Sequence, residues 1–487
     1  MAALMIQGCG SDVGKSVLVA GLCRLFTNRG LSVRPFKPQN MSNNAAVTAD
    51  GGEIGRAQAL QALACRTALT VDMNPVLLKP QSDVGAQLVV LGKMVGTWQA
   101  RGYQAQKGQL LDTVLESFRR LEASCDLVIV EGAGSPAETN LRQGDIANMG
   151  FARAADVPVV LVGDIDRGHV IAALVGAHAV LDDDDRAMIR GFVINKFRGD
   201  PSLFQDGRTE IVQRTGWADL GMAPWLAAAR FLPAEDAVVL DRAVAGETRR
   251  LRIVVPMLSR IANFDDFDAL RVEPEVDLAF VPPGQALPGN ADLVILPGTK
   301  ATLADLAFLR AQGWDIDLAA HVRRGGRVLG ICGGYQMLGR TLSDPEGIEG
   351  PPETAPGLGL LEVDTVLTGD KILRQVAGHV AGLEGRFEGY EMHVGRTVGT
   401  LSPMLILEDG TAEGVRSADG RIMGCYVHGL FNQGSARRSI LGALGAASDG
   451  VDQSLKVDKA LDEIALMLER AFDIAAIAAL AGLEPTR

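Results

Sequence analysis

Residues 3–16 read ALMIQGCGSDVGKS, an apolar run followed by a glycine-rich turn and then by a stretch of helical character over Lys15–Asn28. A Walker A loop needs Gly, four residues and then Gly-Lys-Ser/Thr, after a strand and before a helix. Cys9 stands at the first glycine position and Gly8 lies one residue too early. The strict spacing is not met, but a glycine-rich turn at a helix N-terminus still presents backbone N–H groups to an anion. The stretch therefore predicts a phosphate-binding loop.

Individual loop residues have expected roles in binding ATP and Mg²⁺. Lys15 adds positive charge at the β- and γ-phosphates, and the Ser16 hydroxyl is a ligand for the metal. The five-residue spacing resembles that of ATP-dependent amide- and ring-forming synthetases typified by dethiobiotin synthetase. The expected nucleotide-binding residues are Gly8, Gly10, Asp12, Gly14, Lys15, Ser16 and, at the adenine edge, Asn195 in VINKF.

Two acidic residues are candidates to complete the Mg²⁺ site with Ser16. Glu131, in VIVEGAG, stands at the end of a predicted strand, where doubly wound sheets bind their ligands. Asp50, in TADGGE, lies in a predicted loop. Each acidic residue alone is equally explained as a cap or turn residue, but together with the phosphate loop we interpret both as candidate metal ligands.

Short apolar runs alternate with helical stretches through the first half of the chain. Continuous β-branched runs are typical of buried parallel strands. Such runs occupy residues 3–7, 126–132, 157–164 and 190–197, with helices expected at 15–28, 108–124 and 170–181. We interpret the Asp182–Asp185 run as a solvated loop. The pattern predicts an α/β fold, a doubly wound parallel sheet, over residues 1–232.

The second half repeats this alternation after a weakly patterned linker at 233–250. Strands are expected at 251–257, 278–282, 292–298, 327–332 and 421–429, which predicts another α/β domain over residues 251–440. Residues 456–482 predict one long helix with a single apolar face, formed by Leu461, Ile464, Leu468 and Phe472. We expect the segment 441–487 to be helical and to pack on the body of the protein.

Gly330-Ile331-Cys332-Gly333-Gly334 lies between an apolar run and a helix expected at 335–342. Small residues around a nucleophile permit the tight strand-to-helix turn of a nucleophile elbow, and a helix N-terminus favours a thiolate. The Gly333 N–H is expected to form half of an oxyanion hole, with Gly298 or Thr299 as the second donor. A cysteine outside such a turn is usually inert core, so this position predicts nucleophilic catalysis by Cys332.

A cysteine nucleophile needs a base, and the sequence has six histidines. His169 and His178 belong to the first predicted domain. His393, in GYEMHVGR, is possible. His428, in GCYVHGLF, follows a predicted strand at the far end of the second domain, where a Cys-His hydrolase carries its base. We therefore predict Cys332 and His428 as the catalytic pair.

Composition excludes several classes of partner. The 487 residues carry a net charge of −12, from 47 Lys and Arg against 59 Asp and Glu, without a basic stripe for nucleic acid. The longest uncharged apolar stretch, 169–181, is too short to span a bilayer, and the first residues lack the basic region of a signal peptide. Six scattered cysteines form no CxxC pair. We expect a cytoplasmic protein without nucleic-acid or membrane partners; no oligomeric state is predicted.

The second domain resembles the class I glutamine amidotransferases, with a flavodoxin-like α/β fold, through GICGGYQMLG and YVHGLF. These enzymes usually place a Glu two residues after the catalytic histidine, where this chain has Leu430. The departure matches the cobyric and cobyrinic acid branch, which lacks this Glu. The third member of the triad is therefore unassigned, with Glu391 as a possible substitute.

Nearly the whole chain resembles the cobyric acid synthase family. The resemblance implies amidation of the b, d, e and g carboxylates of adenosylcobyrinic acid a,c-diamide to adenosylcobyric acid, with one ATP and one glutamine for each. The stretches that carry it are PFKPQNMSNN (35–44), EIGRAQALQA (53–62), NPVLLKPQSDVGAQLVVLGK (74–93), VEGAGSPAETNLRQGDIANMGFA (130–152), LVGDIDRGH (161–169), ANFDDFDAL (262–270), LPGTKAT (296–302) and GYEMHVGR (389–396).

A corrinoid with several carboxylates and an acidic protein do not attract each other at long range, so local donors must bind the substrate. An uncharged polar loop supplies such donors, although a capped polar turn explains it equally well. The candidates are Asn40, Ser42, Asn43 and Asn44.

Two other functions remain open at this point. A cobyrinic acid a,c-diamide synthase shares the architecture, but PQNMSNN (38–44) and GDIDRGH (163–169) argue against it. An ATPase of the ParA/MinD kind with an inactive amidotransferase domain is the second, and the presence of both Cys332 and His428 argues against it.

Overall fold

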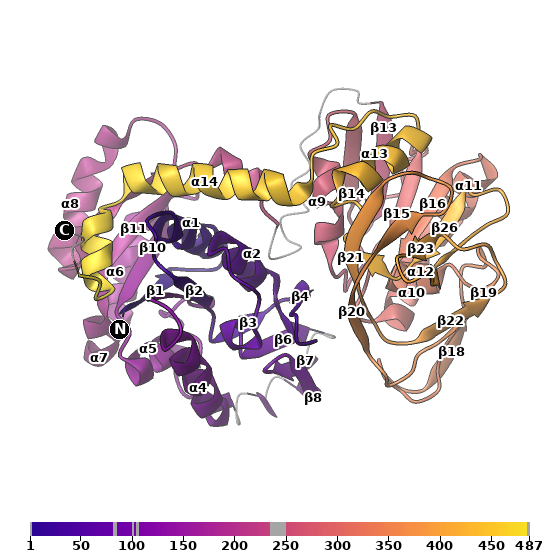
Figure 1. The fold of residues 1–487 in the computed structure, drawn as a ribbon. Helices are drawn as coiled ribbons and strands as arrows, with labels where there is room; N and C mark the ends of the chain where they lie inside the picture. Colours follow the sequence, from indigo (N-terminus) through magenta and orange to yellow (C-terminus); the bar gives the residue numbers. More distant parts are fainter. Residues whose placement is uncertain (1, 81–84, 100–101, 104–106, 234–249, 485–487) are drawn as a thin grey trace. The chain divides into compact units, whose positions relative to one another are not determined.

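The computed structural model describes residues 2–80, 85–99, 102–103, 107–233 and 250–484, which form two compact units (Figure 1). The first unit comprises Met1–Ser42, Thr48–Pro233 and Val457–Arg487, and the second comprises Asn43–Val47 and Ala234–Lys456. Residues 234–249 of the predicted linker lie outside the described residues. The predicted C-terminal segment 441–487 is divided between the units after Lys456.

The first unit is built on a parallel six-stranded sheet. Its central strand, β1, carries the phosphate loop at its C-terminal end and pairs with β10 on one side and with β9 on the other. The strands in spatial order are β12 (Ala218–Pro224), β11 (Ile189–Phe197), β10 (Val159–Asp164), β1 (Ala2–Gly8), β9 (Leu127–Glu131) and β2 (Val33–Phe36). This arrangement confirms the predicted α/β class.

Successive side chains of β1 enter two different cores, because side chains alternate across a strand. Leu4 and Ile6 pack with helices α1 (Lys15–Asn28), α14 (Gln453–Ala471) and α15 (Ile474–Leu480). Met5 packs on the other face with α4 (Leu111–Glu122), α5 (Met149–Ala155) and α6 (Val170–Val180). A strand covered on both faces must be apolar throughout, which explains the uninterrupted run in the sequence.

The C-terminal helical stretch is not one helix. Helix α14 ends at Ala471, and α15 begins at Ile474 with Asp473 as its N-cap, where the carboxylate accepts the Ala476 N–H. A capping aspartate starts a new helix, so the expected single helix over 456–482 is wrong. Leu468 packs so closely on α1 that a methyl group added at Gly21 would lie 2.6 Å from its Cδ1.

The acidic run that we interpreted as a solvated loop forms helix α7 (Asp183–Met188). Asp182 is its N-cap and accepts the Asp185 N–H. The Asp185 carboxylate is buried and binds the Arg142 guanidinium through two hydrogen bonds of 2.6 and 2.9 Å. A charge pattern alone does not identify which acid turns inward, and here the arginine partner lies 43 residues away.

A second, four-stranded sheet of the first unit has no counterpart in the sequence prediction. Its order is β3 (Gln39–Met41), β6 (Val76–Pro80), β7 (Gly85–Val90) and β8 (Lys93–Gln99). Strands β3 and β6 are parallel, whereas β6, β7 and β8 form an antiparallel meander. Helix α2 (Arg56–Ala64) lies between β5 (Glu53–Gly55) and β6 along the chain. The small sheet carries one wall of a cavity described below.

The second unit contains a six-stranded sheet in which every neighbouring pair is parallel except the last. Helices α10 (Thr302–Ala311) and α11 (Trp314–Arg323) connect β15 to β16. The strands in order are β14 (Val276–Val281), β13 (Leu251–Pro256), β15 (Leu293–Leu296), β16 (Arg327–Ile331), β26 (Ile422–Cys425) and β25 (Val415–Arg416). The predicted second α/β domain is thereby confirmed as a fold class.

Two predicted elements of this unit are shorter than expected. The strand expected at 421–429 breaks at Tyr426 into β26, which pairs with β16, and β27 (Val427–His428), which pairs with β21 (Arg386–His393) of a five-stranded sheet. The helix expected at 335–342 is the single turn α12 (Gly333–Met337), followed by β17 (Thr341–Asp344). The break at Tyr426 moves His428 out of the parallel sheet.

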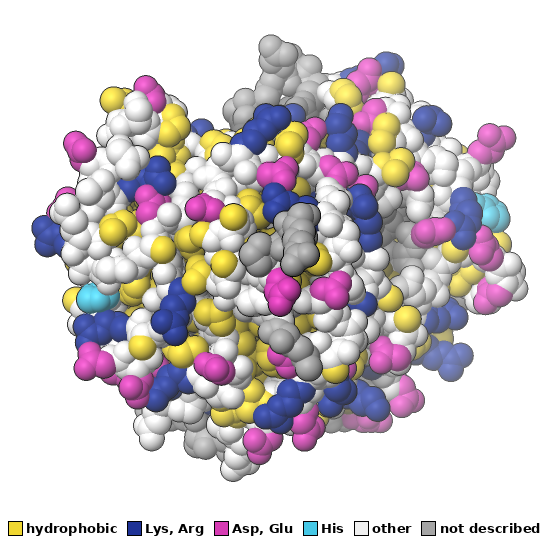
Figure 2. All heavy atoms as spheres, turned by 60° about the vertical axis from the view of Figure 1, so that its left-hand side comes forward, with side chains coloured by type: hydrophobic (Ala, Val, Ile, Leu, Met, Phe, Trp, Pro, Cys, Tyr) yellow, Lys and Arg dark blue, Asp and Glu magenta, His cyan; other side chains and the backbone are white. Residues whose placement is uncertain are grey.

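Figure 2 shows one face of the molecule, on which Lys and Arg side chains are interspersed with Asp and Glu side chains around hydrophobic areas. Among the described residues, no helix has both the length and the apolar character needed to cross a bilayer.

Candidate active sites

The phosphate loop of the first unit lies between the end of β1 and the start of α1. Gly14 precedes the helix with a φ of 92°, a left-handed conformation that favours glycine. A methyl group added at Gly8 would lie 2.5 Å from Val13 Cγ2, so the turn leaves no room for a side chain there. Lys15 Nζ donates to the carbonyl oxygens of Gly10, at 2.9 Å, and Gly134, at 3.1 Å. The ammonium group is thus held at the loop, where it can form an ion pair with a bound phosphate.

Ser16 and Glu131 meet beside this loop. The Ser16 hydroxyl donates to Glu131 Oε1 at 2.8 Å, and Lys37 Nζ donates to the same oxygen at 3.0 Å. Gln61 donates to the other carboxylate oxygen. Hydroxyl and carboxylate oxygens are the ligand types that Mg²⁺ prefers, so the pair fits that metal. Lys37 was not singled out from the sequence, although its Lys-Pro motif directly precedes the asparagine-rich loop.

Asp50 is not brought to Ser16 and Glu131. It lies in an exposed turn and accepts a hydrogen bond of 2.5 Å from Thr48 Oγ1. No cluster of three or more His, Cys, Asp or Glu side chains suited to a metal occurs among the described residues. The side chains of loop residues follow no strand or helix period, so the sequence pattern could not predict where the Asp50 side chain lies.

Asp12 and Asn195 lie at the phosphate loop but are engaged by the protein. Asn195 Nδ2 donates to the Val13 carbonyl at 2.8 Å, and the residue is buried. Its amide nitrogen therefore supports the loop, while the amide oxygen has no hydrogen-bond partner among the described residues, and the expected contact with an adenine edge stays a prediction. Asp12 has a φ of 58° and forms a 3.4 Å ion pair with Arg167. Both residues thus lie at the phosphate loop, and their roles in nucleotide binding stay predictions.

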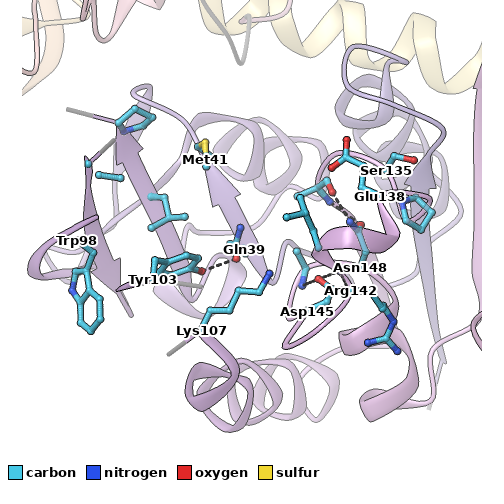
Figure 3. Close-up of a pocket in the computed structure, with 18 residues that line it drawn as sticks. Gln39, Met41, Trp98, Tyr103, Lys107, Ser135, Glu138, Arg142, Asp145 and Asn148 are labelled. Carbon is cyan, nitrogen blue, oxygen red and sulfur yellow. Dashed lines mark hydrogen bonds between the residues drawn. The ribbon is translucent and has the colours of Figure 1, made fainter. Parts of the chain in front are cut away.

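The asparagine-rich loop turns inward. Asn40 Nδ2 donates to Gln58 Oε1 at 3.1 Å, and Asn40, Ser42 and Asn44 are buried. Gln39 and Met41, the neighbours of Asn40 in β3, line a cavity of about 320 Å³ whose lining includes none of Asn40, Ser42, Asn43 or Asn44 (Figure 3). Because side chains alternate along a strand, Asn40 lies on the face of β3 that points away from this cavity.

Cys332 of the second unit lies at the turn between β16 and α12. Its φ of 53° and ψ of −112° are unusual for a residue with a side chain and cost roughly 1–3 kcal/mol. Glycines make the turn possible, since a methyl group added at Gly334 would lie 2.1 Å from the Leu296 carbonyl oxygen. The strained turn presents the thiol at the end of β16, one of the two middle strands of the sheet, as a nucleophile elbow does.

His428 is oriented by Asp266, which the sequence analysis did not select. Its Nδ1 lies 2.7 Å from Asp266 Oδ2, and the Gly429 N–H donates to Asp266 Oδ1 at 2.7 Å. Asp266 belongs to the short helix η7 (Phe264–Phe267). Burial alone would lower the pKa of His428, but the charge and hydrogen bond of Asp266, with a hydrogen bond to Cys332, raise the pKa to about 10.

The alternative third member, Glu391, is bound elsewhere. Both of its carboxylate oxygens accept hydrogen bonds from Arg374, at 2.6 and 3.1 Å. Asp266 stands in FDDFDAL among Asp265 and Asp268, three buried acids in a short stretch. That acidic run is the sequence feature that could have indicated the third member of the triad. Which of its three acids contacts His428 depends on the tertiary structure.

Gly298 and Gly333 flank the cysteine. A methyl group added at Gly298 would lie 3.2 Å from His428 Cε1 and 3.8 Å from Cys332 Cβ. A methyl group added at Gly333 would lie 3.2 Å from the Thr299 backbone nitrogen. The loop after β15 and the first residue of α12 therefore meet at Cys332, where backbone N–H groups can serve as oxyanion donors.

Family models match both halves of the chain. The model described as the CobQ/CobB/MinD/ParA nucleotide binding domain matches residues 4–239. The model described as the CobB/CobQ-like glutamine amidotransferase domain matches residues 252–436. The first match includes the phosphate loop, and the second includes Cys332 and His428.

Curated relatives match over nearly the full length. A cobyric acid synthase of Caulobacter sp. (strain K31) is 71% identical over 486 residues, which cover 99% of this chain and 100% of that protein. A cobyric acid synthase of Rhodobacter capsulatus is 63% identical over 486 residues, covering 99% of this chain and 100% of that protein. One from Methylocella silvestris is 61% identical, covering 96% and 98%. The chain belongs to the cobyric acid synthase family, whose members are glutamine-hydrolysing amidoligases.

Proposed function

We propose that this chain amidates the b, d, e and g carboxylates of adenosylcobyrinic acid a,c-diamide to give adenosylcobyric acid, with ATP–Mg²⁺ and glutamine as co-substrates. One observation carries the proposal. A single chain contains both a phosphate loop with Lys15 hydrogen-bonded to it and a candidate catalytic site formed by Cys332, His428 and Asp266. The first can activate a carboxylate and the second can release ammonia, and family membership supplies the substrate.

The phosphate loop would serve to make the carboxylate electrophilic. A substrate carboxylate oxygen attacks the γ-phosphorus of ATP, ADP leaves, and an acyl phosphate forms. The loop N–H groups and Lys15 Nζ stabilise charge on the transferring group. Ser16 and Glu131 are the residues that would hold Mg²⁺, which when bound neutralises phosphate charge. Lys37, on the same Glu131 oxygen, adds a second cation at this edge of the sheet.

The elbow would serve to hydrolyse glutamine. His428, with its raised pKa, carries the proton that it shares with Cys332, and the sulfur attacks the side-chain amide carbon of glutamine. His428 then gives this proton to the amide nitrogen, ammonia leaves, and a thioester remains. Water attacks the thioester while His428 accepts a proton, and glutamate leaves. Asp266 holds the imidazole in the required orientation throughout.

Backbone donors would stabilise the oxyanion that forms in both glutaminase steps. The N–H groups of Gly333 and Gly298 are the proposed pair, because both glycines flank the cysteine. Ammonia then attacks the acyl phosphate carbon, phosphate leaves, and the carboxylate becomes an amide.

All six cysteines are free. Free thiols accord with a reducing compartment, and we propose the cytoplasm.

The proposal is tested by incubating purified protein with adenosylcobyrinic acid a,c-diamide, ATP–Mg²⁺ and amide-¹⁵N glutamine, followed by mass spectrometry of the corrinoid. The expected result is a stepwise gain of up to four labelled amides. An unchanged corrinoid with active glutaminase and ATPase would overturn the substrate. The same reaction with unlabelled glutamine and ¹⁵N ammonium is the control for the nitrogen source.

A further inference from the structure

The cavity of about 320 Å³ in the first unit has no role in the function described so far. Its walls come from the small sheet, which includes β3, and from the segment between β9 and α5 (Figure 3). Gln39 and Met41 line one side, Arg142 and Asp145 the other, and Lys107 extends between them. The cavity thus combines an apolar wall with a few convergent polar groups, as small-molecule sites do.

The cavity adjoins the phosphate loop through the segment after Glu131. Lys15 Nζ donates to the Gly134 carbonyl at 3.1 Å, and the residues on either side, Ala133 and Ser135, line the cavity. Asn148 holds this segment by accepting the Ala133 N–H at 3.1 Å. A carboxylate at this end of the cavity would therefore lie next to the segment whose Gly134 carbonyl binds Lys15, the lysine that we assign to the phosphates of ATP.

Lys107 is the group inside the cavity whose charge is least compensated. The residue is 6% exposed, and its side chain forms no hydrogen bond or ion pair with another described residue. Burial lowers its pKa, and the charge of Asp145 acts in the opposite direction. The stem of the side chain is buried while its ammonium group lines the cavity without a bonded partner in the described part of the chain, so an anionic ligand would stabilise it.

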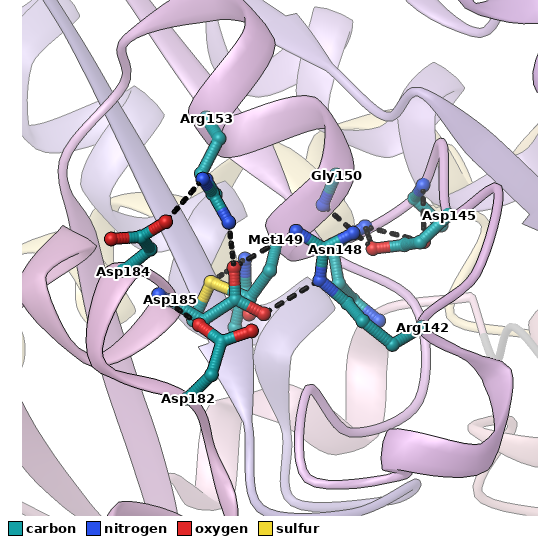
Figure 4. A network of polar contacts seen from close by, with 11 residues as sticks. Arg142, Asp145, Asn148, Met149, Gly150, Arg153, Asp182, Asp184 and Asp185 are labelled. Atoms are coloured by element: carbon teal, nitrogen blue, oxygen red, sulfur yellow. Dashed lines mark hydrogen bonds and ion pairs between the residues drawn. The ribbon is translucent and has the colours of Figure 1, made fainter.

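Two of the three other charged residues that line the cavity, Asp145 and Arg142, already have partners (Figure 4), whereas the exposed carboxylate of Glu138 has none among the described residues. The Asp145 carboxylate accepts the N–H groups of Asn148 and Gly150 at the start of α5. The Arg142 guanidinium is bound by Asp185 through two hydrogen bonds. An entering carboxylate would therefore find Lys107 as its counter-ion among the described residues.

Two exposed side chains of the lining are apolar, and a third, Glu138, is charged. Met41 is 56% exposed and Leu141 is 43% exposed, and both belong to the lining. Exposed apolar side chains around a polar cavity mark a surface that binds an apolar body. A volume of about 320 Å³ is at the lower end of the roughly 300–1,000 Å³ of ligand sites, and a macrocycle with several side arms would fill more than this.

We propose that the cavity receives one carboxylate side arm of the corrinoid at a time, with the carboxylate against Lys107 and the macrocycle against Met41 and Leu141 at the mouth. This inference rests on the proposed function, because it takes the corrinoid as the acyl acceptor. It places the reacting oxygen between Lys107 and the segment that Lys15 contacts. Each of the four carboxylates must then enter the same cavity to react.

Equilibrium dialysis of cobyrinic acid a,c-diamide against the full-length protein, without ATP or glutamine, measures this binding directly. Lys107→Met keeps the length of the side chain and removes its charge, and we expect at least about tenfold weaker binding, because the carboxylate loses a charge-assisted hydrogen bond. The matched control is Lys93→Met, at an exposed lysine of β8 outside the lining. Unchanged ATP binding at the phosphate loop reports that each variant is folded in its first unit, which carries both positions.

A second pair of variants avoids the buried position. Met41→Glu adds a negative charge at the mouth and should weaken binding of the polyanion, whereas Met94→Glu, at a residue 54% exposed outside the lining, should not. Wild-type affinity in both Lys107→Met and Met41→Glu would overturn the inference. If the wild-type protein neither binds nor amidates the corrinoid, the proposed function itself fails.

Discussion

The phosphate loop and the nucleophile elbow both lie at the carboxyl end of a parallel strand, yet they are assembled differently. The loop takes its lysine, its hydroxyl and its glycines from residues 8–16 alone, and adds Glu131 from the neighbouring strand. The elbow takes Cys332 from one strand end, while His428 and Asp266 come from segments 96 and 66 residues away.

This difference affects how each site tolerates change. Many backbone N–H groups of a contiguous loop share the charge of a phosphate, so the loss of one side chain leaves part of the binding. The elbow depends on a single sulfur and on one imidazole held by one carboxylate. We therefore expect losses at the elbow to be larger and to be confined to glutamine use.

The largest effect is expected for Cys332→Ala. Without the sulfur no thioester forms, and glutaminase activity should fall by about 10⁶-fold, as for the loss of other catalytic nucleophiles. Amidation with ammonium chloride and ATP should persist, which mass spectrometry of the corrinoid would measure. Equal loss of both activities would contradict the division of labour between the two units.

Asp266→Asn should have the next largest effect. An amide cannot stabilise the imidazolium of His428, and glutaminase kcat should fall by about 10⁴-fold with little change in the ammonia-dependent reaction. Glu391→Gln is the matched control, because Glu391 is bound to Arg374 and should leave kcat within about threefold of wild type. The reverse ranking would assign the third triad position to Glu391.

Lys15→Ala tests the other side of the comparison. Loss of the ammonium group should lower ATP-dependent amidation by about 10³-fold, because it contributes to charge stabilisation at the phosphates. Basal glutaminase activity, measured as glutamate release without ATP, should remain. Normal ATP turnover in this variant would remove the loop from the mechanism.

The smallest effect concerns stability against pH. The folded state raises the pKa of His428 from 6.5 to about 10, so between these values it holds a proton that the unfolded chain has lost. The stabilisation is fully present below pH 6.5 and disappears as pH rises through 10. Melting temperatures across this pH range should fall by several degrees more in the wild type than in Asp266→Asn. Parallel curves would show that the pair does not couple to folding.

The sequence predicted the parallel sheets of both units because their strands are buried on both faces and read as uninterrupted apolar runs. It placed the start and end of α1 at Lys15 and Asn28, as the structure does. It missed the small sheet carrying β3, β6, β7 and β8, whose strands mix polar and apolar residues, as in KMVGTWQ of β8. It also joined α14 and α15, because Asp473 reads as one more polar position on a helix until its cap is seen.

Within the sites, the residues that can be recognised from the chain alone are those whose function follows from local backbone shape. Lys15, Ser16 and Cys332 lie in glycine-rich turns between a strand and a helix, and such turns have a signature in consecutive residues.

The sequence also proposed Glu131, with Asp50 as a second candidate, and His428. The fold was needed to show that Glu131 is the carboxylate that contacts Ser16 and to find Asp266 beside His428. A turn is specified by neighbours in sequence, whereas a hydrogen-bond partner is specified by the packing of whole elements.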